Sequence, residues 1–338
     1  MQQNRTVLSF LIFPIILLAA FHAPVGLAES DEFSITIKKE KPKKPETPAE
    51  QIEAAGYTKR GADTCLRCHD EESEYPVLPI FKTKHAVVAD ERTPFAGRQC
   101  EACHGPGEFH TQTEEGEEAG SIVSFNPVDD DLIATPERYN RLCLNCHEKD
   151  ARIGWQGSVH ESVGTTCTNC HRIHVEHDQV LATASQPDVC LSCHKQQRAE
   201  IHRASAHPIR FGQMACSECH NPHGSVSDTL LIRPTINETC YTCHAEKRGP
   251  FLWEHAPVAE DCTTCHVPHG SSHPALLARR LPLLCQQCHS QTGHPSVAYT
   301  AGALPPSGAA GFLVAKSCLN CHSQVHGSNH PSGIKLSR

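Results

Sequence analysis

The sequence predicts a fold made mostly of coil and short α-helices, without significant β-sheet, and three features of the chain predict it. Aromatic residues make up 5% and hydrophobic residues 38% of the 338 residues, a thin supply for a large peptide core. Cysteine-rich motifs between Cys143 and Cys285 begin only 22–26 residues apart, too close for independent globular modules. No segment shows the strict apolar–polar alternation typical of a half-buried strand. Something other than polypeptide must therefore fill much of the interior.

The motif Cys-x-x-Cys-His indicates what that filler is, because it occurs ten times and uses all twenty cysteines. This spacing is the attachment signature of c-type haem, in which two thiols add to the vinyl groups of one porphyrin and the adjacent imidazole is held at the iron. The predicted haem-attaching cysteines are Cys65, Cys68, Cys100, Cys103, Cys143, Cys146, Cys167, Cys170, Cys190, Cys193, Cys216, Cys219, Cys240, Cys243, Cys262, Cys265, Cys285, Cys288, Cys318 and Cys321. The predicted proximal iron ligands are His69, His104, His147, His171, His194, His220, His244, His266, His289 and His322.

Two other chemistries compete for these cysteines. Twenty cysteines in an exported chain ordinarily suggest a disulfide framework, and paired Cys-x-x-Cys knuckles can bind zinc. Neither chemistry explains why histidine follows every second cysteine. Haem attachment is therefore the leading interpretation.

A five-fold internal repeat predicts the second ligand of each iron. Each unit reads as a motif, a histidine, a second motif and a further histidine, so the five units supply one extra histidine per motif. Methionine is set aside, because Met214 is the one methionine left after Met1 and it lies only two residues before Cys216. Bis-histidine ligation is thus expected. The predicted distal ligands are His85, His110, His160, His174, His207, His223, His255, His269, His294 and His326.

Some of these choices have close competitors. His207 is preferred over His202, and His326 over His330, while His177 and His273 are expected to be surface residues. A histidine three residues past a motif histidine should not bind the same iron, since on a helical turn the two lie side by side, about 5–6 Å apart at Cβ. The second axial site lies across the porphyrin. Such a histidine is expected to reach a neighbouring haem and so to tie successive haems together.

Three segments are expected along the chain. Residues 1–28 carry Arg5, an apolar run and a small-x-small site at 26–28, which are the features of a secretory signal peptide. Residues 29–60 are charged and interrupted by proline, as in a flexible leader. Residues 61–338 are expected to form one decahaem domain of five two-haem repeats.

Charge and hydropathy narrow the partners and the location. The formal net charge of −8 argues against a nucleic-acid partner. After the signal, no apolar stretch approaches the roughly 18 residues of a membrane helix, so the chain is expected to have no membrane span of its own. Thioether attachment in bacteria takes place outside the cytoplasm, which fits the export signal. The mature protein is therefore expected in the periplasm.

With the cofactor included, the predicted fold is that of a multihaem cytochrome c, with coil and short helices wrapped around a linear stack of ten covalently bound c-type haems. Helices are expected just before motifs, as at 135–139, where threonine caps the helix and proline takes its first position. Another is expected over 195–203.

Three C-terminal segments, 240–258, 284–289 and 317–333, resemble the MtrA/DmsE/PioA/MtoA family of periplasmic decahaem cytochromes. The similarity covers roughly residues 55–338 and includes the number and spacing of the motifs. It implies bis-histidine haems in one continuous conduit, inserted into an outer-membrane β-barrel porin. It also implies an extracellular multihaem cytochrome beyond the porin, with periplasmic or inner-membrane cytochromes as donors or acceptors.

The expected function is electron conduction between periplasmic carriers and the cell exterior, not enzymatic catalysis. The alternatives are a soluble periplasmic shuttle to a terminal reductase complex and a multihaem enzyme of nitrogen metabolism. Such an enzyme needs a haem with a vacant face, whereas here every motif has a candidate second ligand. The ligands leave open the direction of electron flow and its final acceptor.

Overall fold

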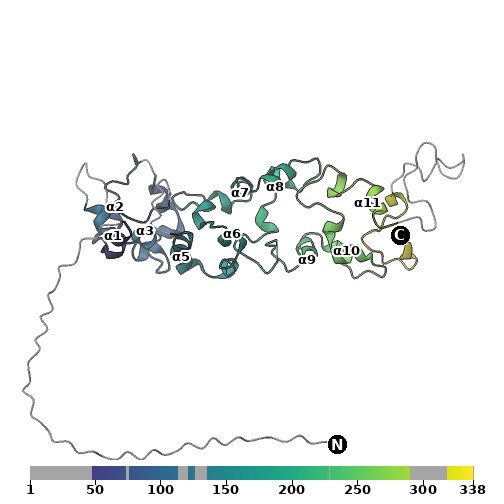
Figure 1. The fold of residues 1–338 in the computed structure, drawn as a ribbon, viewed down its shortest axis with the longest axis horizontal. Coiled ribbons are helices and arrows are strands. Elements are labelled where there is room, and N and C mark those ends of the chain that lie inside the picture. The colour runs from purple at the N-terminus through teal and green to yellow at the C-terminus, as the bar shows by residue number, and fades with distance from the viewer. Residues whose placement is uncertain are drawn as a thin grey trace, which may run out of the picture. The chain divides into compact units, whose positions relative to one another are not determined.

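The computed structural model describes residues 48–73, 76–112, 121–125, 135–227, 229–289 and 318–337. The chain divides into two compact regions, Met1–Lys44 and Pro45–Arg338, and every described residue belongs to the C-terminal region. Taken by itself, this C-terminal region has its elements arranged along one long axis in chain order, from α1–α3 to α11 (Figure 1). The predicted signal peptide and His294 lie outside the described residues.

All helices in the described part of the chain are short, and the longest has 12 residues. The α-helices are α1 (Pro48–Ala54), α2 (Ala62–Cys65), α3 (Glu101–His104), α4 (Glu108–Thr111), α5 (Pro136–His147), α6 (Val159–Ser162), α7 (Gln186–Cys190), α8 (Lys195–Glu200), α9 (Ile236–Cys240), α10 (Ala256–Glu260) and α11 (Leu283–Gln286). The 3-10 turns are η1 (Leu78–Lys82), η2 (Lys84–Ala86), η3 (Pro94–Ala96), η4 (Asp150–Arg152), η5 (Cys167–Asn169), η6 (Gln179–Leu181), η7 (Pro208–Phe211), η8 (Cys216–Glu218), η9 (Ala245–Lys247), η10 (Cys262–Thr264), η11 (Pro274–Leu276), η13 (Cys318–Asn320) and η14 (Gly333–Lys335).

The two helices expected from the sequence are confirmed. Helix α5 begins after an extended Thr135 with Pro136 in its first turn, where the missing amide hydrogen costs nothing. The Thr135 side chain makes no capping hydrogen bond to the helix, so that part of the expectation is wrong. Helix α8 ends at Glu200, three residues before the expected end. None of the helices within the described ranges is both long and apolar enough to cross a membrane.

Each motif forms one turn of helix, and in most two-haem units the two motifs lie in different kinds of helix. The first motif lies at the end of an α-helix, in α2, α5, α7, α9 and α11. The second motif opens a 3-10 turn in η5, η8, η10 and η13, and opens α3 in the first unit. Nearly every motif histidine donates its amide to the carbonyl of the first cysteine, as from His69 to Cys65 at 3.0 Å. Residues at i, i+3 and i+4 share one helical face, so each turn presents both sulfurs and the imidazole together.

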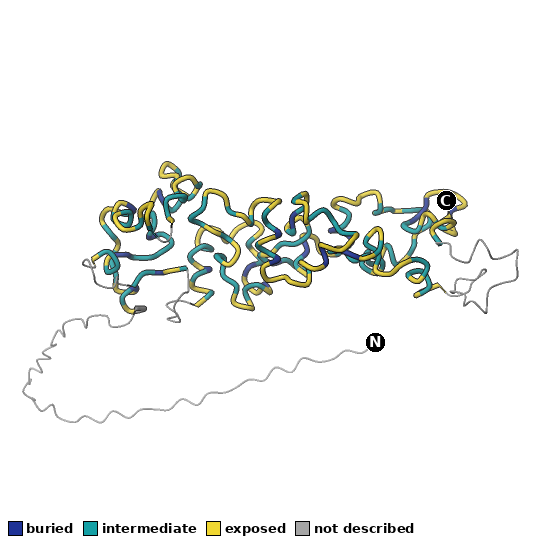
Figure 2. Tube along the Cα trace, turned by 90° about the horizontal axis from the view of Figure 1, so that it is seen from above, coloured by how far each residue is buried: buried dark blue, intermediate teal, exposed yellow. Residues whose placement is uncertain are grey.

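Among the described residues, β-structure is limited to isolated bridges, such as His220 with Leu231 and His266 with Leu277. The peptide core is equally sparse. Its buried apolar residues are Ile52, Ala62, Phe95, Val123, Trp155, Leu191, Ile201, Ala215 and Leu231. Figure 2 shows buried segments only in short, scattered stretches between half-buried and exposed ones. The expected coil-and-helix architecture without a sheet is confirmed.

The expected flexible leader is too long at its C-terminal end. Residues 48–54 form α1, with Ile52 only 5% exposed. The residues after α1 are held by carboxylates of the first two-haem unit. The Thr58 amide donates to Glu101 Oε1 at 2.9 Å, and the Gly56 amide donates to Glu108 Oε2 at 3.0 Å. These side chains pair with backbone amides, which composition alone does not reveal.

Buried asparagines tie the two motifs of a unit together. Asn140 in α5, 2% exposed, donates Nδ2 to the Thr165 carbonyl at 3.0 Å, and its Oδ1 accepts from the Cys167 amide at 2.8 Å. Asn237 in α9 occupies the same place in the fourth unit, and its Oδ1 accepts from the Cys262 amide at 2.8 Å. Each asparagine therefore fixes the start of the second motif relative to the helix that carries the first.

Replacing Asn140 with alanine is expected to destabilise the folded protein by about 2–4 kcal/mol, because the change leaves a backbone donor and a backbone acceptor without partners. The midpoint of guanidinium unfolding, followed by circular dichroism, should fall. Arg141→Ala, at an exposed position of the same helix that does not line the cavity described below, is the control and should leave the midpoint unchanged. Equal midpoints for the two variants would show that the hydrogen bonds of Asn140 do not stabilise the folded protein.

Candidate functional site

One continuous cavity runs through the described residues of the C-terminal region, with a volume of about 5090 Å³. Every motif histidine lines it, and so does every motif cysteine except Cys321. Shared over ten motifs the volume is about 500 Å³ each, within the roughly 300–1000 Å³ of a pocket for one cofactor-sized ligand. The cavity is what the sparse peptide core leaves open.

Across this cavity, motif histidines face non-motif histidines in pairs. A metal–imidazole bond is about 2.0–2.1 Å long and the ring centroid lies about 1.1 Å behind the bonded nitrogen, so two imidazoles on opposite sides of one metal have centroids about 6.3 Å apart. The observed pairs and centroid distances are His69–His110, 6.2 Å; His147–His85, 5.9 Å; His104–His174, 5.9 Å; His194–His160, 6.1 Å; His171–His223, 6.1 Å; His244–His207, 6.4 Å; His220–His269, 6.1 Å; His289–His255, 6.1 Å; and His266–His326, 6.2 Å. The structure thus brings together nine motif histidines and nine predicted distal histidines at the spacing of a shared iron.

The histidine that follows a second motif faces the second motif of the preceding unit. His174 lies three residues after His171 but stands opposite His104, 5.9 Å away. His223, His269 and His326 repeat this step, opposite His171, His220 and His266. The first unit has no predecessor, and its His110 faces its own first motif.

The histidine that precedes a second motif faces the first motif of the following unit. His85 of the first unit faces His147 of the second, and His160 faces His194 of the third. The same step pairs His207 with His244 and His255 with His289. Successive units are therefore interlocked in both directions, which the spacing of histidines along the chain does not specify.

The competing histidines lie elsewhere. His202, His177, His273 and His330 are absent from the cavity lining, whereas His207 and His326 line it. His177 is 91% exposed beside Glu176, and the Nδ1 of His330 bonds within its own turn to Ser332. His294, the predicted partner of His322, lies outside the described residues.

The cysteines place the motifs in one file that follows the chain. Within a unit the first cysteines of the two motifs meet, as where the Cys65 thiol hydrogen-bonds to Cys100. Between units the second cysteines approach closely enough to interact electrostatically, as Cys170 does with Cys193. The within-unit contacts are Cys65–Cys100, Cys143–Cys167, Cys190–Cys216, Cys240–Cys262 and Cys285–Cys318. The between-unit pairs that interact electrostatically are Cys103–Cys146, Cys170–Cys193, Cys219–Cys243 and Cys265–Cys288.

A hydrogen bond through Nδ1 fixes the orientation of many of these imidazoles. The Nδ1 of a ligating histidine commonly donates to a carbonyl or carboxylate, which leaves Nε2 for the metal. Among the described motif histidines, those of the second motifs bond through Nδ1 to a neighbouring loop. The partners are Val123 O for His104, Asp178 Oδ2 for His171, Thr229 O for His220, Ala275 O for His266 and Lys335 O for His322. On the facing side His160, His207 and His255 bond to the carbonyls of Pro222, Pro268 and Val325.

Burial keeps the facing histidines in the form that binds metal. It lowers the pKa of His223 to about 4, and it lowers the pKa of His104 and His174 as well. These imidazoles are neutral at pH 7, with a lone pair free for iron. Burial also raises the pKa of the Cys103 thiol to about 11, so that its sulfur is uncharged in the cavity.

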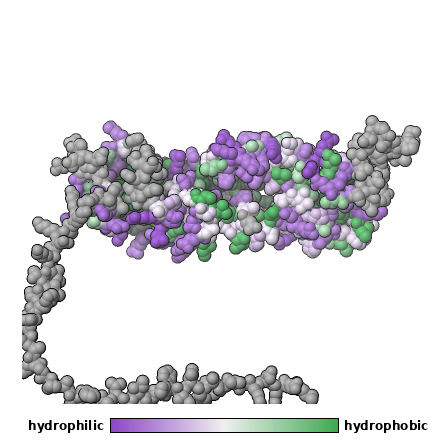
Figure 3. All heavy atoms as spheres, viewed as in Figure 1, coloured by the Kyte–Doolittle hydropathy of each residue, from purple (hydrophilic) through white to green (hydrophobic). Residues whose placement is uncertain are grey.

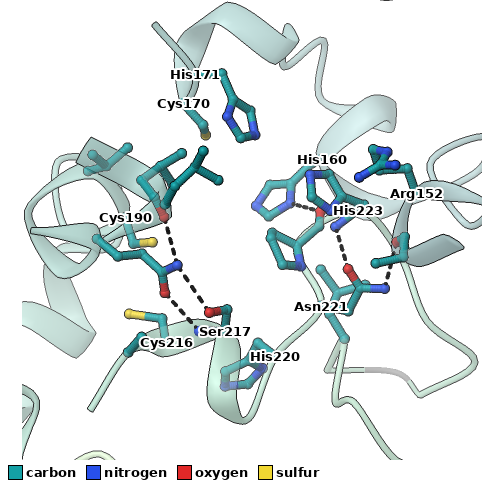
Figure 4. A pocket seen from close by; sticks show the side chains of 18 of the residues that line it. Arg152, His160, Cys170, His171, Cys190, Cys216, Ser217, His220, Asn221 and His223 are labelled. Atoms are coloured by element: carbon teal, nitrogen blue, oxygen red, sulfur yellow. Dashed lines mark hydrogen bonds between the residues drawn. The ribbon is translucent and has the colours of Figure 1, made fainter. Parts of the chain in front are cut away.

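Two buried nitrogens without partners also fit a bound group. Trp155 Nε1 and His69 Nδ1 are fully enclosed and have no hydrogen-bond acceptor, although both residues line the cavity. Trp155 packs beside His223, with ring centroids 6.4 Å apart (Figure 4 shows the facing His171 and His223 in this part of the cavity). All twenty cysteines are free of disulfides, and the described residues contain no cluster of three or more side chains suited to hold a metal by themselves. Haem fits this donor set, and when bound it supplies a one-electron iron couple.

Comparisons with known proteins place this donor set in a family. A model of the doubled CXXCH motif matches residues 207–249 and 255–294, and a model of NrfB-like c-type cytochromes matches residues 100–187. The chain is 48% identical to the multiheme cytochrome MtrA of Shewanella baltica over 299 residues, which cover 86% of this chain and 87% of that protein. An undecaheme cytochrome from the S-layer of Carboxydothermus ferrireducens is 19% identical over 72% of this chain and 33% of that structure, with a TM-score of 0.13. The chain belongs to the MtrA family of multihaem cytochromes, electron-transfer proteins with covalently attached c-type haems.

Proposed function

We propose that this protein is a periplasmic decahaem conduit that carries electrons between periplasmic carriers and the cell exterior through an outer-membrane β-barrel porin. The observation that carries the proposal is the set of nine facing histidine pairs, each at the centroid spacing of two imidazoles across one iron. The tenth iron is assigned His322 and His294 by the repeat.

Six-coordinate iron suits a carrier better than a catalyst. Two imidazoles held by the protein stay in place in both oxidation states, so the change of charge requires little rearrangement. No axial position is then left for a substrate. The chain contributes rigid ligands, fixed through backbone carbonyls such as that of Thr229 bonded to His220.

The order of the motifs suits transfer over distance. Hydrogen bonds and electrostatic interactions between cysteines link each motif to the next from Cys65 to Cys318. A bilayer is about 40–45 Å thick with its headgroups, which is too far for one transfer step and calls for several sites in a row. An unbroken file of ten supplies them.

Location and partners follow from the predicted signal peptide and from family membership. Residues 1–28 carry the export features, and attachment of c-type haem takes place outside the cytoplasm. Figure 3 shows apolar side chains scattered among hydrophilic ones on one face of the protein. Exposed apolar residues that do not line the cavity include Val88, Ile153 and Val226. We assign a porin around the conduit, an extracellular multihaem cytochrome beyond it and periplasmic or inner-membrane cytochromes on the other side.

The proposal is tested with the haem-loaded protein and its porin in liposomes that enclose a redox dye. External reductant or oxidant should change the colour of the dye, in either direction, at a rate far above that of liposomes with porin alone. If the dye does not respond although the protein is fully loaded, the transmembrane conduit is refuted. A protein that instead exchanges electrons only with a soluble reductase complex would be a periplasmic shuttle.

A further inference from the structure

The fourth motif, Cys167–His171, is the one described second motif whose imidazole bonds to a side chain rather than to a backbone carbonyl. His171 Nδ1 lies 2.7 Å from Asp178 Oδ2. In the other second motifs the same nitrogen bonds to a peptide oxygen at 2.7–2.9 Å. The geometry of the bond is shared, but the charge of the acceptor differs.

The surrounding backbone holds the Asp178 carboxylate in this position. Its side chain is 11% exposed, and its Oδ1 accepts hydrogen bonds from the backbone amides of Arg172 and Val180 at 3.3 and 3.4 Å. Those two amides orient the carboxylate so that Oδ2 points at His171. The loop of this unit takes a shorter path than the loops of the third and fourth units, whose carbonyl acceptors lie nine residues after the motif histidine instead of seven.

We propose that Asp178 sets the potential of the haem bound between His171 and His223, making it lower than the potentials of the other second-motif haems. This inference rests on the bis-histidine ligation proposed above. A carboxylate hydrogen-bonded to a ligating imidazole increases the basicity of the ligand, and second-shell hydrogen bonds are a recognised lever on haem potential. A buried anion also favours the ferric over the ferrous state, so both effects lower the potential.

Other charges near this site do not cancel the effect. Arg152 interacts electrostatically with His223 on the opposite side, but its guanidinium is 35% exposed and lies 4.0 Å from the Asp150 carboxylate. Another buried carboxylate, Glu200, faces His269 at the longer distance of 3.4 Å and is shared with Gln196. Asp178 is thus the strongest charged contact to an axial histidine among the described residues.

The test is Asp178→Asn in the full-length, haem-loaded protein. Asparagine presents a neutral oxygen like the carbonyls at the other second motifs. At a fixed potential the ratio of ferrous to ferric haem at this site should rise about tenfold, which corresponds to an upward shift of 59 mV for a one-electron couple. A redox titration followed by electron paramagnetic resonance should show one low-spin ferric signal with this shift and with altered g-values.

Glu176→Gln is the matched control, because it removes the same formal charge from the same loop. Glu176 is 47% exposed, and its carboxylate is directed to Lys82 at 2.9 Å and to His177 at 3.9 Å. Its titration should overlay that of the wild type, and Asp178→Glu should stay near it as well. An unchanged Asp178→Asn titration overturns the proposal, as does an equal shift in Glu176→Gln. So does loss of the low-spin state in both Asp178 variants, which would show a structural role alone. A wild-type protein with a high-spin haem at Cys167 and Cys170 would instead contradict the underlying ligation.

Discussion

Replacing His174 with alanine is expected to produce one high-spin haem, and that haem is the one attached at Cys100 and Cys103. His174 follows the fourth motif, but its ring stands 5.9 Å from His104 of the second motif. Loss of the imidazole leaves the second iron with one axial protein ligand, whereas His171 keeps its partner His223. Electron paramagnetic resonance should show a high-spin ferric signal from one haem in ten, with unchanged haem content by pyridine haemochrome.

Cysteine variants identify which haem has changed. The high-spin signal should disappear when His174→Ala is combined with Cys100→Ser and Cys103→Ser, and it should persist when the cysteines of the fourth motif are replaced instead. Added imidazole should restore the low-spin state. His177→Ala is the control, since this side chain is 91% exposed and does not line the cavity. A signal that follows the fourth-motif cysteines would mean that the pairing across units is wrong.

The attachment motifs could be predicted from the sequence because thioether chemistry needs its residues at fixed spacing. A cysteine pair and an adjacent histidine must share one helical turn, so the requirement appears within five residues. The distal histidines were predicted from their number and from the repeat, and nine of the ten predicted residues line the cavity opposite a motif histidine. The assignment of each to its partner was beyond the sequence. His174 and His104 are 70 residues apart, and only the path of the intervening coil brings them together.

The hydrogen bonds behind the ligands had no sequence signal of any kind. Most acceptors are peptide carbonyls, such as that of Thr229, and any residue type provides one. Asp178 is the exception, but an aspartate in a loop is ordinarily a solvated or capping residue. The boundary of the leader failed for a related reason. Helix α1 and the residues after it are held by Glu101 and Glu108, whose role depends on where the first unit folds.

Removing the fifth haem through Cys190→Ser and Cys193→Ser is expected to slow electron transfer along the whole protein strongly. The fifth motif neighbours the fourth through Cys193 and the sixth through Cys190, whereas the fourth and sixth motifs are linked through the His171–His223 pair, because His223 follows the sixth motif. Without the fifth haem, electrons must cross directly from the fourth haem to the sixth. In the liposome assay with porin, the response of the enclosed dye should fall far below that of the intact protein, although nine haems remain by pyridine haemochrome.

The matched control is Cys65→Ser with Cys68→Ser, which also leaves nine haems but removes the first one of the file. The remaining motifs from Cys100 to Cys318 stay in an unbroken series of neighbours, so a small soluble reductant should still drive measurable transfer. The comparison separates the position of a haem from the number of haems. Equal rates in the two variants would show that electrons do not have to pass through the middle of the file, and the linear conduit would have to be abandoned. A loss confined to the fifth-motif variant is the result that a single file of sites requires.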